Sequence, residues 1–195
     1  MPRTKQFDEE QVLEKAVELF WRQGYHATSI QDVVDNLSIN RASLYDTYGD
    51  KRTLYIKSLK RYRTDETQAI VRLLQAPGNA LDKIRNLLEQ RVRAILSDGA
   101  HRGCFIVNTA VELVNHDAEI ARIAFDNQQE VEMALRQIIR EGQAAGQITT
   151  RHDAEALAQY LVSNFNGLQV MGKINPDKNV LENIARITLD VLTSR

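Results

Sequence analysis

The stretch that decides the fold is residues 28–51, which read TSIQDVVDNLSINRASLYDTYGDK. Thr28 followed by Gln31 matches the pattern of a helix N-cap. The apolar residues after it recur at the spacing of one helix face: Ile30, Val33, Val34 and Leu37. We therefore expect a short helix with its N-cap at Thr28 and its end near Asn36. After the turn around Ser38, Asn40 is a second N-cap and predicts a helix through Tyr48.

Two short helices joined by a tight turn are the arrangement with which many proteins place one helix in the major groove of DNA. In this stretch the apolar positions can form the small core between the helices. The polar side chains left to face outward are Arg41, Ser43, Asp46 and Thr47. The same pattern also fits an αα-hairpin inside a helical bundle, and the local sequence does not decide between the two.

The flanking sequence extends this arrangement on both sides. Asp8 with Gln11 predicts the start of an amphipathic helix near residues 9–23, and Asp50 caps another helix after Gly49. Residues 40–63 hold seven basic and two acidic side chains, which places positive charge where a nucleic-acid backbone can use it. A solvated helix surface is the alternative explanation for this charge.

The rest of the sequence is also typical of helices. The clearest loop signal, Pro77-Gly78-Asn79, separates the opening part from the remainder of the chain. Beyond it, the spacing of apolar residues predicts five helices, over about residues 81–98, 105–114, 117–145, 153–173 and 177–193. We expect an all-α fold with a three-helix helix-turn-helix head at residues 1–65 and a larger helical body at residues 66–195.

Composition agrees with this fold and excludes several classes of protein. The 195 residues are 43% hydrophobic and 26% charged, with a net charge of −1. No apolar run approaches the roughly 18 residues needed to cross a bilayer, and the N-terminus lacks a signal-peptide pattern, so we expect a cytoplasmic protein without membrane association. A single cysteine, Cys104, excludes an intramolecular disulfide. No metal site or other cofactor is expected.

Two other classes of function are alternatives to DNA binding. The four histidines are scattered over predicted loops and helix ends, and no HExxH, CxxC or Gly-rich phosphate motif occurs, which argues against an enzyme. A helical adaptor that binds only protein is the second alternative. Such an adaptor needs neither the polar helix predicted between Asn40 and Tyr48 nor the basic helix predicted after Asp50.

Four segments in order resemble one known family: Ala16 to Phe20, Gly24-Tyr25, Thr28 to Val34 and Ser43 to Lys51. Together they are similar to the DNA-binding head of the TetR/AcrR family of transcriptional regulators, over residues 7–63. The resemblance implies a homodimer that binds a palindromic operator in double-stranded DNA. It further implies a repressor that leaves the operator when a small-molecule effector of unknown identity occupies the body. Ser38 departs from the family pattern, which commonly has glycine in the turn, and Tyr48 replaces a common phenylalanine.

The resemblance also implies roles in DNA binding, position by position. Positions that commonly hold phosphates in the family are occupied here by Thr28, Tyr45, Tyr48 and Lys51, and positions near base edges by Arg41, Ser43, Asp46 and Thr47. A helix N-terminus attracts an anion, a lysine supplies a point charge, and an arginine can read guanine through two hydrogen bonds. The alternatives are that Thr28 only caps, that the tyrosines pack, and that Asp46 repels a phosphate. The basic segment Arg3-Thr4-Lys5 is a candidate for the minor groove, with a frayed terminus as the alternative.

The last two predicted helices are apolar on more than one face, which indicates burial against a second subunit as well as against their own core. We expect an interface of two helices from each subunit. Its predicted contacts are Leu157, Leu161, Leu168, Ile184 and Leu189. A monomeric core is the alternative.

An effector pocket is expected among the helices of residues 81–171. The candidate contacts are Cys104, Asn108, Phe125, Asn164, Phe165 and Met171. Each has a structural alternative, because amides are often satisfied in cores and the apolar side chains also fit a core. Cys104 lies beside Arg102 at a predicted helix start, an environment that favours a thiolate. A redox or electrophile sensor and a small buried hydrophobe are therefore competing hypotheses for this residue.

Overall fold

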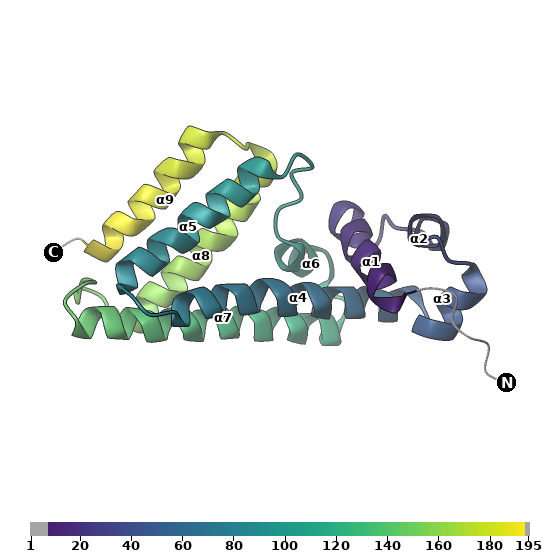
Figure 1. The fold of residues 1–195 in the computed structure, drawn as a ribbon, viewed down its shortest axis with the longest axis horizontal. Helices are drawn as coiled ribbons and strands as arrows, with labels where there is room; N and C mark the ends of the chain where they lie inside the picture. Colours follow the sequence, from purple (N-terminus) through teal and green to yellow (C-terminus); the bar gives the residue numbers. More distant parts are fainter. Residues whose placement is uncertain (1–7, 194–195) are drawn as a thin grey trace.

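The computed structural model describes residues 8–193, which form nine α-helices and no β-strand (Figure 1). The prediction of an all-α fold is confirmed. The helices are α1 (Glu9–Gln23), α2 (Ile30–Leu37), α3 (Arg41–Tyr48), α4 (Lys51–Gln75), α5 (Ala80–Ser97), α6 (Phe105–Leu113), α7 (Ala118–Ala144), α8 (Ala154–Ile174) and α9 (Lys178–Thr193). The candidate minor-groove segment Arg3-Thr4-Lys5 lies outside the described residues.

Side-chain caps explain where most of the helices begin. Asp8, Asn40 and Asp50 each accept a hydrogen bond from a backbone amide in the first turn of α1, α3 and α4. These three N-caps confirm the helix starts predicted from the sequence. Each is decided by contacts within a few residues, which is why local sequence is sufficient to find them.

Helix α4 carries the chain from the head into the body. It runs beside α7 along the length of the molecule, while α2 and α3 lie at one end and α9 at the other (Figure 1). The predicted boundary between residues 65 and 66 therefore falls inside one continuous helix, Lys51–Gln75. Helix α4 therefore contributes side chains to the cores of both the head and the body.

The core of the head is completed by the body. Phe105 of α6 and Ile120 of α7 are buried in the same cluster as the apolar residues of α1 to α4. Tyr55 of α4 lies at its centre and packs edge to face on Phe20 and Phe105, with ring centroids 4.9 and 5.5 Å apart. The packing therefore does not divide the chain at residue 65.

A second core fills the body between α5, α7, α8 and α9. Leu88, Leu135 and Leu181 are completely buried in it. The close approach of α8 to α5 requires Gly172, because a Cβ at this position would lie 2.2 Å from Cγ2 of Ile95. In the part of the chain that the structure describes, no helix is long and apolar enough to cross a membrane.

Three of the predicted dimer contacts belong to this core. Leu157, Leu161 and Leu168 are 2%, 0% and 0% exposed, so their side chains stabilise the single chain and are not available to a second subunit. The predicted contact set is corrected accordingly. Ile184 and Leu189 are partly buried against the same core. The large apolar side chains that α8 and α9 do expose are Val170, Met171, Ile174 and Ile187.

Candidate DNA interface and effector cavity

Helix α2 begins one residue later than predicted. Its N-cap is Ser29, whose hydroxyl accepts from the Asp32 amide (3.0 Å) while the Asp32 carboxylate accepts from the Ser29 amide (2.8 Å). The hydrogen bonds from the Ser29 hydroxyl and amide lower the pKa of Asp32. Thr28 is completely buried, and its hydroxyl donates to the Gly24 carbonyl at 2.6 Å. The predicted cap at Thr28 is wrong, and this side chain holds the α1–α2 turn together.

The turn between α2 and α3 depends on one left-handed residue. Ser38 has φ 56° and ψ 37°, a conformation that glycine adopts most readily. Ile39 then buries its side chain, and Asn40 caps α3 by accepting a hydrogen bond from the Ser43 amide at 2.8 Å. The angle between α2 and α3 is fixed, because the Ile39 side chain is buried and the Asn40 side chain is hydrogen-bonded.

Helix α3 presents one polar face to solvent. Leu44 and Tyr48 point inward and are 0% and 4% exposed. The outward side chains are Arg41, Ala42, Tyr45 and Asp46, with Ser43 and Thr47 partly exposed beside them. The structure thus places five of the predicted DNA contacts together on one short helix: Arg41, Ser43, Tyr45, Asp46 and Thr47.

Two further residues belong to this face. Gln31 is exposed in the first turn of α2, and its Oε1 accepts a hydrogen bond from Arg41 Nη2 at 3.4 Å. Ala42 is exposed beside Arg41, and a small apolar side chain suits contact with the methyl group of thymine. The position of Ala42 on the exposed face could have been predicted from the sequence. Ala42 precedes Asp46 by one helical turn and therefore lies on the same face of the helix.

The polar groups of Lys51 and Tyr48 are hydrogen-bonded within the head. Lys51 Nζ donates to the carbonyls of Tyr25 and Thr28 at 2.9 and 2.7 Å, and it stands 4.2 Å from the centroid of the Tyr25 ring. Burial lowers the pKa of Lys51. The Tyr48 hydroxyl donates to the Glu9 carbonyl at 3.4 Å. The Tyr48 hydroxyl thus ties α3 to the start of α1, and Lys51 ties the start of α4 to the α1–α2 turn.

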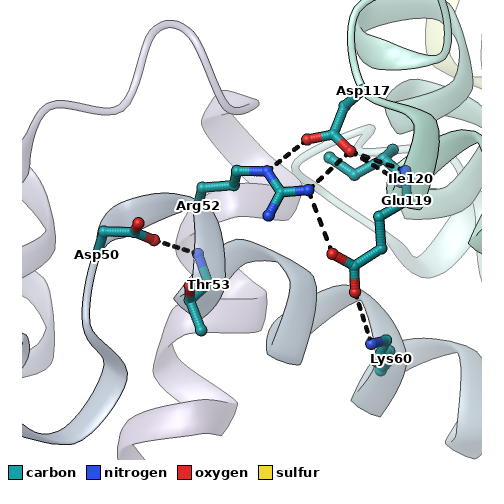
Figure 2. A network of polar contacts seen from close by, with 7 residues as sticks. All are labelled: Asp50, Arg52, Thr53, Lys60, Asp117, Glu119 and Ile120. Carbon is teal, nitrogen blue, oxygen red and sulfur yellow. Dashed lines mark hydrogen bonds and ion pairs between the residues drawn. The ribbon is translucent and has the colours of Figure 1, made fainter.

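An ion-pair network joins the start of α4 to the start of α7 (Figure 2). Arg52 donates from Nε and Nη2 to the two carboxylate oxygens of Asp117 at 2.6 and 2.9 Å, and Nη2 also reaches Glu119 at 3.2 Å. Glu119 is paired in turn with Lys60 at 3.0 Å. The hydrogen bonds from Arg52 lower the pKa of Asp117, and the one from Lys60 lowers the pKa of Glu119. The network ties the head to α7.

Helix α6 holds the turn between α1 and α2 through one carboxylate. Glu112 accepts hydrogen bonds from the backbone amides of Tyr25 (3.0 Å) and His26 (2.7 Å). Gly24 must be glycine here, because its φ is +81° and a Cβ would lie 2.8 Å from Glu112 Oε2. We call this contact the Glu112 clamp.

A cavity of about 400 Å³ lies between α4, α5, α6, α7 and α8. Its walls are mostly apolar, and its size is that of a site for a small organic molecule. Cys104, Phe125 and Phe165, three of the predicted effector contacts, line it together although they come from distant parts of the chain. Phe125 and Val111 line it and are 56% and 84% exposed, which places them at its mouth.

The other three predicted effector contacts do not line this cavity. Asn108 donates to a carbonyl of the preceding loop at 2.8 Å. Asn164 donates to the Tyr160 carbonyl (2.8 Å) and accepts from the Thr188 hydroxyl (3.3 Å). Met171 is 37% exposed on α8. Both amides are satisfied by the protein itself, and contact of these three residues with an effector stays a prediction.

Cys104 stands at the entrance to α6. It is the N-cap residue of that helix, is partly exposed and faces the cavity. The Tyr62 hydroxyl lies 3.8 Å from its Sγ and donates a long hydrogen bond to it. The thiol is therefore part of the cavity wall and is not a completely buried hydrophobic side chain.

Comparison with known protein families covers most of the chain. A family model described as "Bacterial regulatory proteins, tetR family" matches residues 12–57. A second model, described as "Tetracyclin repressor-like, C-terminal domain", matches residues 80–188. The two matches correspond to the helix-turn-helix head and to the body that contains the cavity.

Individual proteins are similar over nearly the full length. The chain is 34% identical to the HTH-type transcriptional regulator YezE of Bacillus subtilis (strain 168), over 98% of this chain and 100% of that protein. It is 28% identical to the HTH-type transcriptional repressor ComR of Escherichia coli (strain K12), over 96% and 90%. A solved structure of a cysteine mutant of the TetR family transcriptional regulator CifR, complexed with double-strand operator DNA, has a TM-score of 0.87 at 24% identity, covering 97% of this chain and 99% of that chain.

Proposed function

Because the chain belongs to the tetR family of bacterial transcriptional regulators, we propose that it is a repressor that binds a palindromic operator as a homodimer. A small molecule in the cavity ends this binding. We assign DNA binding to residues 1–65, and effector binding and dimerisation to residues 66–195. The protein acts in the cytoplasm by binding alone and catalyses no reaction.

The observation that carries this proposal is the exposed polar face of α3. A helix held at a fixed angle by a tight turn fits the major groove, where side chains reach the edges of the bases. Arg41, Ser43, Asp46 and Thr47 read bases, and Tyr45 contacts a phosphate. Tyr48 holds α3 against the start of α1, and Lys51 and Thr28 hold the α1–α2 turn, because their polar groups are engaged within the head.

Two heads are joined through α8 and α9. Val170, Ile174 and Ile187 are exposed on these helices at 43%, 73% and 53%. Ile184, one helical turn before Ile187, is partly buried on the same face of α9, whereas Leu189 points to another side and packs against the core of the single chain. Apolar side chains on two adjacent helices are covered when a second subunit packs its own pair against them. A two-fold dimer then matches the two-fold symmetry of a palindrome.

Helix α6 connects the cavity to the head. Its residues Ile106, Val107 and Ala110 line the cavity, while Glu112 on the same helix holds the α1–α2 turn. An effector that binds better to a shifted position of α6 favours a conformation in which the head is displaced. Operator affinity falls because the two heads no longer fit both half-sites.

Gel retardation tests the proposal, with the palindrome upstream of the coding region as the probe. We expect retention of the intact palindrome. Affinity should fall by about 100-fold or more when one half-site is scrambled, because the second head of the dimer then has no half-site to bind. Affinity for every duplex should fall as salt rises. Equal binding to the palindrome and to random duplex, or no retention at low salt, contradicts the proposal. The second outcome would favour a helical adaptor that binds only protein.

A further inference from the structure

The wall of the cavity is mostly apolar. Among the described residues that line it, Arg91 is the one charged side chain, and no carboxylate faces the space. The other polar groups of the wall are the thiol of Cys104 and the amides of Asn127, Gln128, Asn166 and Gln169. A molecule that enters therefore meets hydrocarbon over most of its surface and one positive charge.

Arg91 extends from α5 and is largely buried, with 18% of its side chain exposed. With the side-chain amide of Gln169 oriented so that its oxygen faces the guanidinium, Arg91 Nε and Nη1 donate to Gln169 Oε1 at 3.2 and 2.9 Å. Among the described residues its one carboxylate partner is Glu66 of α4, at 3.4 Å from Nη1, and the Glu66 side chain is 44% exposed. No hydrogen bond from Nη2 is formed within residues 8–193. The guanidinium thus has a loose counter-ion and an unused amino group beside an apolar cavity.

We propose that the effector is a small organic anion, with one carboxylate on an otherwise apolar body. The carboxylate accepts hydrogen bonds from Arg91. The planar, charged guanidinium binds a carboxylate more strongly than it binds a neutral acceptor. The apolar body lies along α6 and α7 toward the mouth formed by Val111 and Phe125. A cationic compound is excluded, because the cavity offers it no negative charge and places a buried cation beside it.

This inference rests on the proposed function in one respect, since it takes the cavity as the effector site. It adds a prediction that binding alone can test. Placing the carboxylate at Arg91 also competes with Glu66 of α4, the helix that leads to the head. Occupancy therefore alters a contact between α4 and α5 in addition to filling the space beside α6.

The test is isothermal calorimetry of the full chain, without DNA, against three compounds of equal length: decanoate, decanamide and decylamine. We expect decanoate to bind at least about tenfold more tightly than decanamide, because its hydrogen bonds to Arg91 are charge-assisted. Decylamine should not bind measurably. Comparable affinity for decanoate and decanamide, tighter binding of decylamine, or no binding of decanoate overturns the proposal.

Variants locate the carboxylate. Arg91→Gln should lower decanoate affinity by about tenfold or more while leaving decanamide affinity unchanged, and Arg91→Lys should show an intermediate loss because it keeps the charge and lacks the fork. Arg93→Gln is the matched control, since Arg93 lies on the same helix, is 65% exposed in its side chain and pairs with Glu89. If Arg91→Gln is folded by circular dichroism and binds decanoate as well as the wild type, Arg91 does not hold the anion. If Arg91→Gln does not fold, the ratio of decanoate to decanamide affinity in Arg91→Lys and in the wild type decides.

The two proposals fail separately. Retention of the palindromic duplex by the protein without any added compound tests the proposed function. Loss of decanoate selectivity with intact operator binding overturns only the identity of the effector. Selective decanoate binding without operator binding overturns only the role in transcription.

Discussion

At the exposed face of α3, the side chain best suited to read a base is that of Arg41. It extends into solvent at the start of the helix, and its one partner within residues 8–193 is the Gln31 amide, at 3.4 Å. A contact of this length to a neutral group is readily exchanged for guanine, which offers two acceptors.

We therefore expect Arg41→Ala to reduce discrimination between the operator and a random duplex by about 1–3 kcal/mol. Competition binding at fixed salt measures this difference. Arg122→Ala, at an exposed arginine of α7 paired with Asp126, serves as the control. An equal loss of affinity for operator and random DNA would assign Arg41 to phosphates instead.

The turn residue Ser38 contains strain that glycine would remove. Its φ of 56° places Cβ in an unfavourable position, and its side chain is exposed. Ser38→Gly should raise the free energy of unfolding by about 0.5–1 kcal/mol, after subtraction of the greater backbone entropy of glycine in the unfolded chain. Urea unfolding at one protein concentration measures the change.

The same substitution in a helix should act in the opposite direction. Ser97→Gly, at the last residue of α5, removes a side chain from ordinary helical backbone and should lower the free energy of unfolding. A loss of stability in both variants would mean that the left-handed conformation of Ser38 carries no strain.

The helix starts that sequence analysis predicts correctly are those set by contacts between residues close in the chain. Asn40 and Asp50 cap their helices through amides three residues away, so their roles can be read from the pattern. The start of α2 is displaced by one residue, because Thr28–Gln31 and Ser29–Asp32 both fit a capping box and only the packing of Thr28 into the α1–α2 turn decides.

Contacts between distant segments are harder to predict. Lys51 matches a family position that commonly holds phosphates, yet its Nζ bonds two carbonyls of a turn more than twenty residues away. A helix that is apolar on several faces also does not reveal which face enters its own core. Leu168 and Val170 are close in sequence and equally apolar in character, but Leu168 is completely buried whereas Val170 is 43% exposed.

Helix α6 is the element that ties the cavity wall to the head, and Glu112 is its point of contact with the α1–α2 turn. Glu112→Gln keeps one acceptor oxygen but turns an NH₂ group toward a backbone N–H, so the clamp loses one of its two hydrogen bonds. A hydrogen bond to a charged group contributes about 1.5–3 kcal/mol, which corresponds to a factor of about ten to a hundred in local opening.

Hydrogen exchange at the Tyr25 and His26 amides should therefore become faster by about this factor, while amides in α8 and α9 stay unchanged. Glu119→Gln is the matched control, because Glu119 also connects the body to the head but does so through exposed side chains. If exchange at both amides is the same in Glu112→Gln and wild type, the clamp does not restrain the turn.

For the whole molecule, the arrangement of α8 and α9 decides whether two heads act together. These helices bury one apolar side in the core of the single chain and expose another, which includes Ile187 at 53%. A substitution at Leu168 thus tests the stability of the single-chain core, and one at Ile187 tests association with a second subunit. A search for apolar residues in the sequence cannot distinguish these two roles. Leu168→Asp would place a charge among the apolar side chains of the core, whereas Ile187→Asp would place it on the surface.

We expect Ile187→Asp to sediment as a folded monomer with unchanged helical circular dichroism, because a charge facing the second subunit opposes association without disturbing the core. Its operator affinity should fall by about 100-fold or more, since each head then binds its half-site alone. Leu168→Asp should instead lose helical signal. Met133→Asp is the matched control, because Met133 is an equally exposed apolar residue (50%) that lies on α7. A dimeric Ile187→Asp together with a monomeric Met133→Asp would move the interface from α8 and α9 to α7, and the heads would then be paired through the helix that runs beside α4.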